Sequence, residues 1–325
     1  MKSFLNKTFS ILTVLLFISL FSCQKDSSGP GDWVSQYLLD KAIVEVNTNN
    51  TATGLETVFQ TSITDSTQRA QLCQAFIHPV RFLDDKSGYF FIETYDAWMV
   101  AHATNSALIG TNRMNVQDIN GKFYVKDMVN SILYTGFGNV EYYFENPSTG
   151  QTARKIGYVK SIPAAEFFIG SGFYGDPAPK YYTPNEASMK IAEQATVAMA
   201  QGIGGAYTGY YSDSAARVEF ARQMIDHVRF FDDQSGYFFI YDFDCHNVAH
   251  ATQKNLQGQN LYNYQDSKGN YVIRELLKVA KEKAEGGTYE YWWNNPVSGK
   301  EEPKLAFVIK IPGIDYFIGS GIYLE

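Results

Sequence analysis

The sequence predicts an α+β protein made of two tandem copies of one module, each a long N-terminal helix packed on an antiparallel sheet. Residues 80–94 (VRFLDDKSGYFFIET) and 228–242 (VRFFDDQSGYFFIYD) are identical at 11 of 15 positions, at an offset of 148. Both halves then continue through the same order of helical and strand-like segments. Aromatic residues make up 15% of the chain, which favours sheet over a helical bundle. A repeat of this length indicates a duplicated domain.

The repeat covers nearly the whole chain after its first 32 residues. A one-residue insertion changes the offset to 149, and the copies end in the matching stretches 167–174 (FFIGSGFY) and 316–323 (YFIGSGIY). Three prolines in residues 175–184 disfavour a continuous helix or a central strand there. We therefore expect one module over 33–176 and a second over 177–325.

Each copy predicts the same elements in the same order. A mostly helical region comes first, over 33–79 and 185–227, with Asn185 as a candidate N-cap. Gly202 to Gly205 (GIGG) predict a kink or turn within the second region. In the first copy, strands are expected at 88–92, around His102, and at 139–144, 153–162 and 166–174, with a helix at 125–133 that corresponds to 272–285 in the second copy.

The N-terminus predicts an export signal. Residues 11–21 (ILTVLLFISLF) are almost continuously apolar after a short positive segment, which is too short to span a membrane but suits a signal peptide. The following LFSC at residues 20–23 resembles a bacterial lipobox, and it predicts a signal peptide over 1–22 and lipidation of Cys23. The alternative is an ordinary signal peptide that ends near a cysteine.

The segment after the expected lipidation site predicts a tether. Residues 23–32 are polar and rich in Gly, Pro and Ser, as flexible linkers are. Lys25-Asp26 resembles the surface-export signal of some Bacteroidetes lipoproteins. No second apolar span follows, so we expect a membrane-anchored lipoprotein, periplasmic or on the outer-membrane surface.

Charge and composition exclude several classes of function. The first 22 residues carry two lysines and no acid, so the remainder has 25 basic and 34 acidic side chains, which argues against nucleic-acid binding. Cys73 and Cys245 occupy non-equivalent positions in the repeat, and their spacing predicts neither a disulfide framework nor a metal site. No nucleophile motif, zinc motif or phosphate loop is present. We expect no enzyme activity, no cofactor and no metal.

An ordered set of motifs appears in both copies and carries a family resemblance. It comprises Arg-Phe-x-Asp-Asp-x-Ser-Gly-Tyr-Phe-Phe, a strand ending in His, Gly-x-Asn, Asp-x-x-Gly, Glu-Tyr-x-Trp/Phe-x-Asn-Pro and Phe-Ile-Gly-Ser-Gly-x-Tyr. This set resembles the Cache_2 type of extracytoplasmic sensory module, over about 33–174 and 185–323. The resemblance implies a PAS-like sheet with a small-molecule pocket, of the kind that binds small organic acids in chemoreceptors and histidine kinases. Because no output domain is visible, we expect a transporter or sensor partner.

The candidate ligand-binding residues occupy mostly equivalent positions in the two copies. Each has an alternative structural interpretation: a histidine bonded to the backbone, an arginine paired with the neighbouring aspartates at a helix end, a core tyrosine, or an exposed lysine. Tyr158 has no equivalent candidate in the second copy, because its counterpart there is Phe307, and phenylalanine has no hydroxyl. The candidates are Arg81, Tyr89, His102, Lys155 and Tyr158 in the first copy, and Arg229, Tyr237, His250 and Lys304 in the second.

These observations predict an extracytoplasmic lipoprotein that binds small polar metabolites, organic carboxylates above all, for sensing or uptake. One rival is a structural or adhesive surface lipoprotein that kept the fold and has no working pocket. A second rival is an enzyme with a pocket histidine as general base, which requires a carboxylate within hydrogen-bond reach of that histidine. The sequence leaves open the ligand, the partner, the membrane leaflet, the oligomeric state and whether both modules bind.

Overall fold

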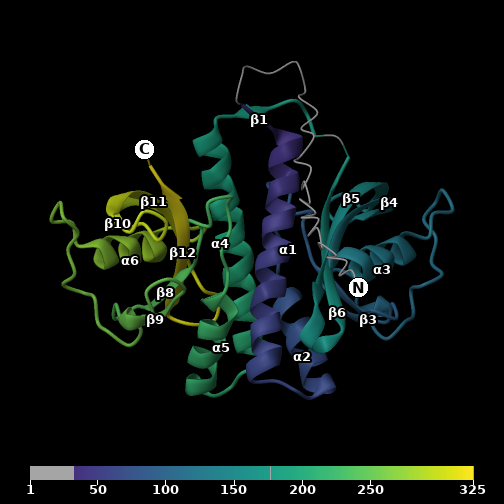
Figure 1. Cartoon of the computed structure of the whole chain (residues 1–325), viewed down its shortest axis with the longest axis horizontal. Helices are drawn as coiled ribbons and strands as arrows, with labels where there is room; N and C mark the ends of the chain where they lie inside the picture. Colours follow the sequence, from purple (N-terminus) through teal and green to yellow (C-terminus); the bar gives the residue numbers. More distant parts are fainter. Residues whose placement is uncertain (1–32, 176, 325) are drawn as a thin grey trace, which may run out of the picture. The chain divides into compact units, whose positions relative to one another are not determined.

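Each half of the chain folds into a five-stranded antiparallel sheet with helices on both faces (Figure 1). The computed structural model describes residues 33–175 and 177–324. The expected signal peptide, Cys23 and the whole expected tether lie outside these residues. Within them, no helix is both long and apolar enough to cross a membrane. The α+β fold class predicted from the repeat is confirmed.

The two sheets have the same topology. The first has the strand order β3-β2-β6-β5-β4 and the second β9-β8-β12-β11-β10, and all neighbouring strands are antiparallel. The strands of the first are β2 (Phe91–Thr94), β3 (Met99–His102), β4 (Phe137–Asn146), β5 (Gln151–Ile162) and β6 (Phe167–Tyr174). Those of the second are β8 (Phe239–Asp242), β9 (Asn247–His250), β10 (Gly287–Asn294), β11 (Glu301–Lys310) and β12 (Tyr316–Tyr323).

Helices cover both faces of each sheet. In the first half, α1 packs on β5 and β6, and α3 packs on β4 and β5 from the other face; α4 and α6 take the same places in the second half. The α-helices are α1 (Gln36–Thr61), α2 (Ser66–Ile77), α3 (Tyr124–Thr135), α4 (Pro184–Gly209), α5 (Ser214–Asp226) and α6 (Val272–Glu282). Short 3-10 helices are η1 (Ser106–Leu108), η2 (Pro163–Ala165) and η3 (Lys254–Leu256).

Two details of the predicted elements are wrong. The strand expected over 88–92 begins only at Phe91, because Gly88 forms an isolated bridge with Phe82 across a tight loop. Asn185 is not the N-cap of the second long helix. Thr183 is, and it forms a reciprocal capping box with Glu186, which leaves Pro184 at the first helical position.

The expected kink at Gly202 to Gly205 is also wrong, because α4 runs through these glycines without a break. They provide close approach between helices instead. A Cβ on Gly202 would lie 2.2 Å from Cζ of Phe76 in α2, and a Cβ on the equivalent Gly54 of α1 would lie 2.6 Å from Cε of Met224 in α5. In each module, a glycine in the long helix thus allows a large side chain of the other module to pack directly on the helix backbone.

The helices join the two modules into one core. α1 contacts both α4 and α5, while α2 contacts α4, and α1 and α4 run side by side in Figure 1. The linker adds a two-stranded sheet in which β1 (Val34–Ser35) pairs with β7 (Tyr181–Tyr182). Buried apolar residues from both halves share one large cluster, and a second cluster lies between the first sheet and α3. Cys73 and Cys245 are both buried and form no disulfide.

Candidate functional site

A fully buried lysine lies on the face of the first sheet that α3 covers. Lys155 and Val159 share one face of β5 by strand alternation, and Val159 packs with Met128 and Ile132 of α3. Nζ of Lys155 is 3.9 Å from the ring centroid of Tyr89. Across the described part of the chain it has no hydrogen-bond partner. Burial lowers the pKa of Lys155 to about 7.

His102 lies beside this lysine at the end of β3. Its Nδ1 accepts the backbone N–H of Asn105 at 3.0 Å and that of Thr104 at 3.3 Å. The proton of the neutral ring therefore lies on Nε2, which makes Nε2 a hydrogen-bond donor. Burial, with the charge of Lys155 nearby, lowers the pKa of His102 to about 3, so the ring is neutral near pH 7.

Aromatic rings enclose these two side chains. The ring of His102 is 5.3 Å from that of Tyr89 and 6.3 Å from that of Phe144. Tyr174 completes the set, with its centroid 5.0 Å from Nζ of Lys155 and its hydroxyl donating to the carbonyl of Glu145. We call Tyr89, His102, Phe144, Lys155 and Tyr174 the Lys155 cluster.

The second module repeats the arrangement with the equivalent residues. Nζ of Lys304 is 3.8 Å from the ring centroid of Tyr237 and, within residues 33–175 and 177–324, makes no hydrogen bond. Burial lowers the pKa of Lys304 well below its usual range. Nδ1 of His250 accepts the backbone N–H of Gln253 at 3.0 Å, as in the first module. We call Tyr237, His250, Trp293, Lys304 and Tyr323 the Lys304 cluster.

The glycines of the terminal motif let the Lys155 cluster pack closely on β6. Gly172 of β6 lies next to Lys155, and a Cβ there would come within 2.8 Å of the lysine Cε. A Cβ on Gly170 would lie 2.2 Å from Cζ of Phe91. The glycines of FFIGSGFY thus allow the lysine stem and an aromatic ring to pack directly on the strand backbone.

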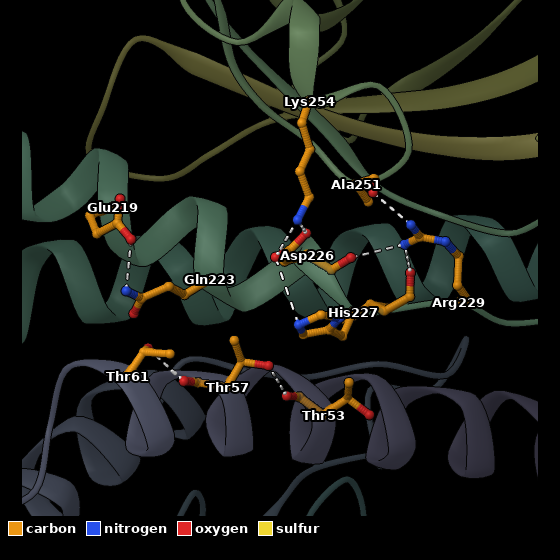
Figure 2. Close-up of polar contacts among 11 residues, drawn as sticks. Thr53, Thr57, Thr61, Glu219, Gln223, Asp226, His227, Arg229, Ala251 and Lys254 are labelled. Atoms are coloured by element: carbon orange, nitrogen blue, oxygen red, sulfur yellow. Dashed lines mark hydrogen bonds and ion pairs between the residues drawn. The ribbon is translucent and has the colours of Figure 1, made fainter.

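Both candidate arginines hold the backbone around the histidine strands. One guanidinium nitrogen of Arg229 donates to the carbonyls of Asp226 and Val228, and another donates to the carbonyl of Ala251 (Figure 2). Figure 2 also shows that the Asp226 carboxylate pairs with Lys254 rather than with this arginine. Arg81 makes the equivalent three bonds, one of them to the carbonyl of Ala103. Each arginine therefore fixes the residue directly after the histidine.

Tyr158 is the one candidate that lies on the opposite face of its sheet. Its hydroxyl donates to Oδ1 of Asn49 in α1, at 3.1 Å. Strand alternation explains this, because Tyr158 is three residues from Lys155 on β5. The structure thus brings together Tyr89, His102 and Lys155, and Tyr237, His250 and Lys304, and it leaves Tyr158 out.

Sequence reasoning missed several members of the site. Tyr174 and Tyr323 are matched in the repeat, and Phe144 and Trp293 follow the Glu-Tyr motif, so both pairs could have been found by alignment of the copies. Glu93, which shares a face of β2 with Phe91, is buried and was also missed. Alternation along the strand would have placed it on the cluster side of the sheet.

The arrangement is suited to holding a small anion. A buried ammonium, a neutral imidazole with an N–H donor and two tyrosines offer donors inside an aromatic shell. The imidazole nitrogen that a carboxylate would have to orient for general-base catalysis accepts backbone N–H groups instead. A groove of about 930 Å³ lies elsewhere, between α2 and the end of α4, where Gln71 and Tyr210 are among its lining residues.

Comparisons with known proteins match both halves. The model of the Cache domain family (dCache_2) matches residues 59–192 and again 180–325. The sensor histidine kinase MctS of Rhizobium johnstonii is 38% identical over 92 residues, 28% of this chain and 20% of MctS. The methyl-accepting chemotaxis protein McpP of Pseudomonas putida is 25% identical over 145 residues, 45% of this chain and 26% of McpP. The matches thus span only about a fifth to a quarter of the curated relatives.

Among solved structures, a methyl-accepting chemotaxis protein from Vibrio parahaemolyticus is similar to part of the chain. It is 30% identical with a TM-score of 0.34, and the match covers 39% of this chain and 84% of that one.

Proposed function

The chain belongs to the Cache domain family, and on that premise we propose that it binds small organic carboxylates at the Lys155 and Lys304 clusters. Cache domains sense small molecules outside the cytoplasm in chemoreceptors and sensor kinases, the two classes to which the curated relatives belong. This proposal adds two statements to the family membership: the ligand is a carboxylate, and each module has a binding site.

The observation that carries the proposal is the unpaired buried lysine in each module. A charge in a low-dielectric interior is strongly unfavourable unless an opposite charge or hydrogen bonds compensate it. Both Lys155 and Lys304 are fully buried, and no carboxylate of the described residues forms an ion pair with either. A bound carboxylate would supply the missing charge, with Nε2–H of His102 or His250 as a second donor.

The proposal includes the setting of the protein. We place it outside the cytoplasm as a lipoprotein anchored through Cys23, where it captures a metabolite for sensing or uptake. Because α1 packs on β5, the strand that carries Lys155, a ligand at the lysine can shift the helix against the sheet and present the change to a transporter or sensor partner.

Isothermal titration of the protein with short carboxylates, amines and neutral sugars tests the proposal. We expect carboxylates alone to bind, at two sites, with one site lost in Lys155→Met or Lys304→Met and both lost in the double variant. Lys160→Met, the same substitution of a partly exposed lysine on β5, serves as the matched control and should bind as the wild type does. Carboxylate binding that survives the double variant, or no binding by the wild type, would contradict the proposal.

The pH dependence of this binding provides an independent check. A carboxylate prefers the charged lysine, whose pKa in the free protein is about 7 for Lys155. The affinity of this site should therefore stay constant below pH 7 and fall about tenfold per pH unit above it, until the pKa of the bound lysine is reached. An affinity that does not change from pH 6 to 9 would show that carboxylate binding does not depend on the charge of Lys155.

A further inference from the structure

The two modules differ at positions on the cluster side of the sheet, although they share their fold. Glu93 follows Phe91 by two residues on β2, and the equivalent position of β8 is Tyr241. The loop after β3 adds Arg113, where the second module has Leu261. The first module thus combines two further ionisable groups with the lysine, and the second has only neutral groups at these positions.

Glu93 is buried on the cluster side of its strand and lacks a partner for one carboxylate oxygen. It is 1% exposed, and it shares a face with Phe91, whose ring centroid is 6.0 Å from Nζ of Lys155. Counting the described residues only, Oε2 of Glu93 and Nε of Arg113 make no hydrogen bond, and the two side chains form no ion pair. Burial raises the pKa of Glu93 to about 8, which the charge of Arg113 partly offsets.

Among the described residues, the side chain of Arg113 has one hydrogen-bond partner nearby, the hydroxyl of Tyr124, and this partner does not reach its Nε. A terminal nitrogen of Arg113 donates to the hydroxyl of Tyr124 at 2.5 Å, and Tyr124 stacks on Tyr142 with ring centroids 4.4 Å apart. Among these side chains, Nζ of Lys155 and Nε of Arg113 are thus buried donors without an acceptor in the described part of the chain, and Oε2 of Glu93 is a buried acceptor without a donor.

The second module has a different set of buried polar groups at these positions. The hydroxyl of Tyr241 and the side-chain amide of Asn247 are buried, and these two uncharged groups interact with each other. Tyr241 shares a face of β8 with Phe239, and their ring centroids are 6.0 Å apart. Asn247 lies opposite Tyr241 in the β8–β9 pairing. At the positions that correspond to Glu93 and its neighbours, the second module thus has uncharged polar groups.

We propose that the first module takes an amphoteric ligand, with a carboxylate at Lys155 and Arg113 and a protonated amine at Glu93, and that the second takes a carboxylate bearing a neutral hydroxyl or carbonyl group. This inference rests on the proposed function and divides its ligand class between the two modules. An ammonium group satisfies the Glu93 carboxylate, which a plain carboxylate ligand would leave buried and unpaired. In the second module, the same ammonium would find no charge to pair with beside Tyr241 and Asn247.

Three ligands of one carbon skeleton test the inference: propionate, L-lactate and L-alanine, which differ only in carrying hydrogen, hydroxyl or ammonium at one carbon. Titration of the full chain with Lys304→Met reports on the first module, and titration with Lys155→Met reports on the second. We expect the first module to bind alanine at least tenfold more tightly than propionate or lactate. We expect the second to bind lactate at least tenfold more tightly than alanine.

Glu93→Gln in the Lys304→Met chain keeps the shape of the side chain but cannot take up the negative charge that pairs with an ammonium group. It should abolish the preference for alanine and retain propionate binding, whereas Glu166→Gln, a change of an exposed glutamate directly before β6, should leave the preference intact. The same ranking of the three ligands in both modules would overturn the inference while the proposed function stands, even if Glu93→Gln does not fold. Failure of the wild type to bind any carboxylate would overturn both.

Discussion

Lys155→Met is expected to make the ligand-free protein more stable than the wild type. Methionine fills nearly the same volume as the lysine stem and brings no ammonium into the aromatic shell of Tyr89 and Tyr174. A shift in the pKa of Lys155 from 10.5 to about 7 corresponds to several kcal/mol of unfavourable charge burial, since each pKa unit is worth about 1.4 kcal/mol. We expect a gain of about 1–4 kcal/mol in the free energy of unfolding, measured by urea denaturation at pH 6.

The gain should depend on pH in a defined direction. Between pH 7 and 10.5 the unfolded chain holds the Lys155 proton and the folded protein does not, so wild-type stability rises with pH across this window. The difference between Lys155→Met and the wild type should therefore be largest below pH 7 and vanish toward pH 10.5. Lys160→Met provides the control and should change stability by less than about 0.5 kcal/mol, as surface substitutions do. A Lys155→Met variant less stable than the wild type at pH 6 would show that the lysine has a stabilising partner.

Gly202→Ala is expected to destabilise the protein, against the usual effect of this substitution in a helix. Alanine normally stabilises a helix interior by roughly 1 kcal/mol relative to glycine. Here its Cβ would lie 2.2 Å from Cζ of the fully buried Phe76, so α2 and α4 must separate or the ring must move. We expect a net loss of about 1–3 kcal/mol, as overpacked cores show, measured by urea denaturation followed by circular dichroism.

A second substitution separates this steric effect from other effects of the glycine. Phe76→Leu removes part of the ring that the new methyl group meets, so the double variant should lose less stability than the sum of the two single variants. Both modules should unfold in one transition in every variant, because a large cluster of buried residues is shared between them. Additive losses would place the cause in α4 itself rather than in its contact with Phe76.

The sequence predicted the fold well because the repeat allowed each helix and strand to be predicted from two equivalent stretches of sequence. The motif around Gly88 and the closing glycine motif located the strands, and Asp65 and Asp213 cap equivalent helices in the two copies. The GIGG stretch misled the prediction, since local propensity penalises glycine in a helix and only the partner helix reveals the close approach. The prediction of Asn185 as the N-cap was wrong for a different reason. Thr183 and Glu186 together satisfy two backbone N–H groups at the start of the helix, which a single asparagine cannot do.

The candidate site was predictable in part. His102 and Lys155 were found as repeated polar residues, but the complete burial of the lysine could not be read from a strand of mixed composition. Tyr158 was assigned to the site although strand alternation places it on the face toward Asn49. Glu93 escaped notice because the comparison of the copies looked for identity, and this residue is one of the four that differ between residues 80–94 and 228–242.

The pairing of α1 with α4 has a consequence for how two different sites can be kept together. Subunits encoded separately would assemble into like and unlike dimers in competition, and only the unlike dimer would carry both kinds of site. A single polypeptide that joins the copies through residues 175–184 makes the unlike pair the only intramolecular product and raises the effective concentration of one half near the other. Its stoichiometry is therefore fixed at one to one during synthesis, which leaves each copy free to diverge without losing its neighbour.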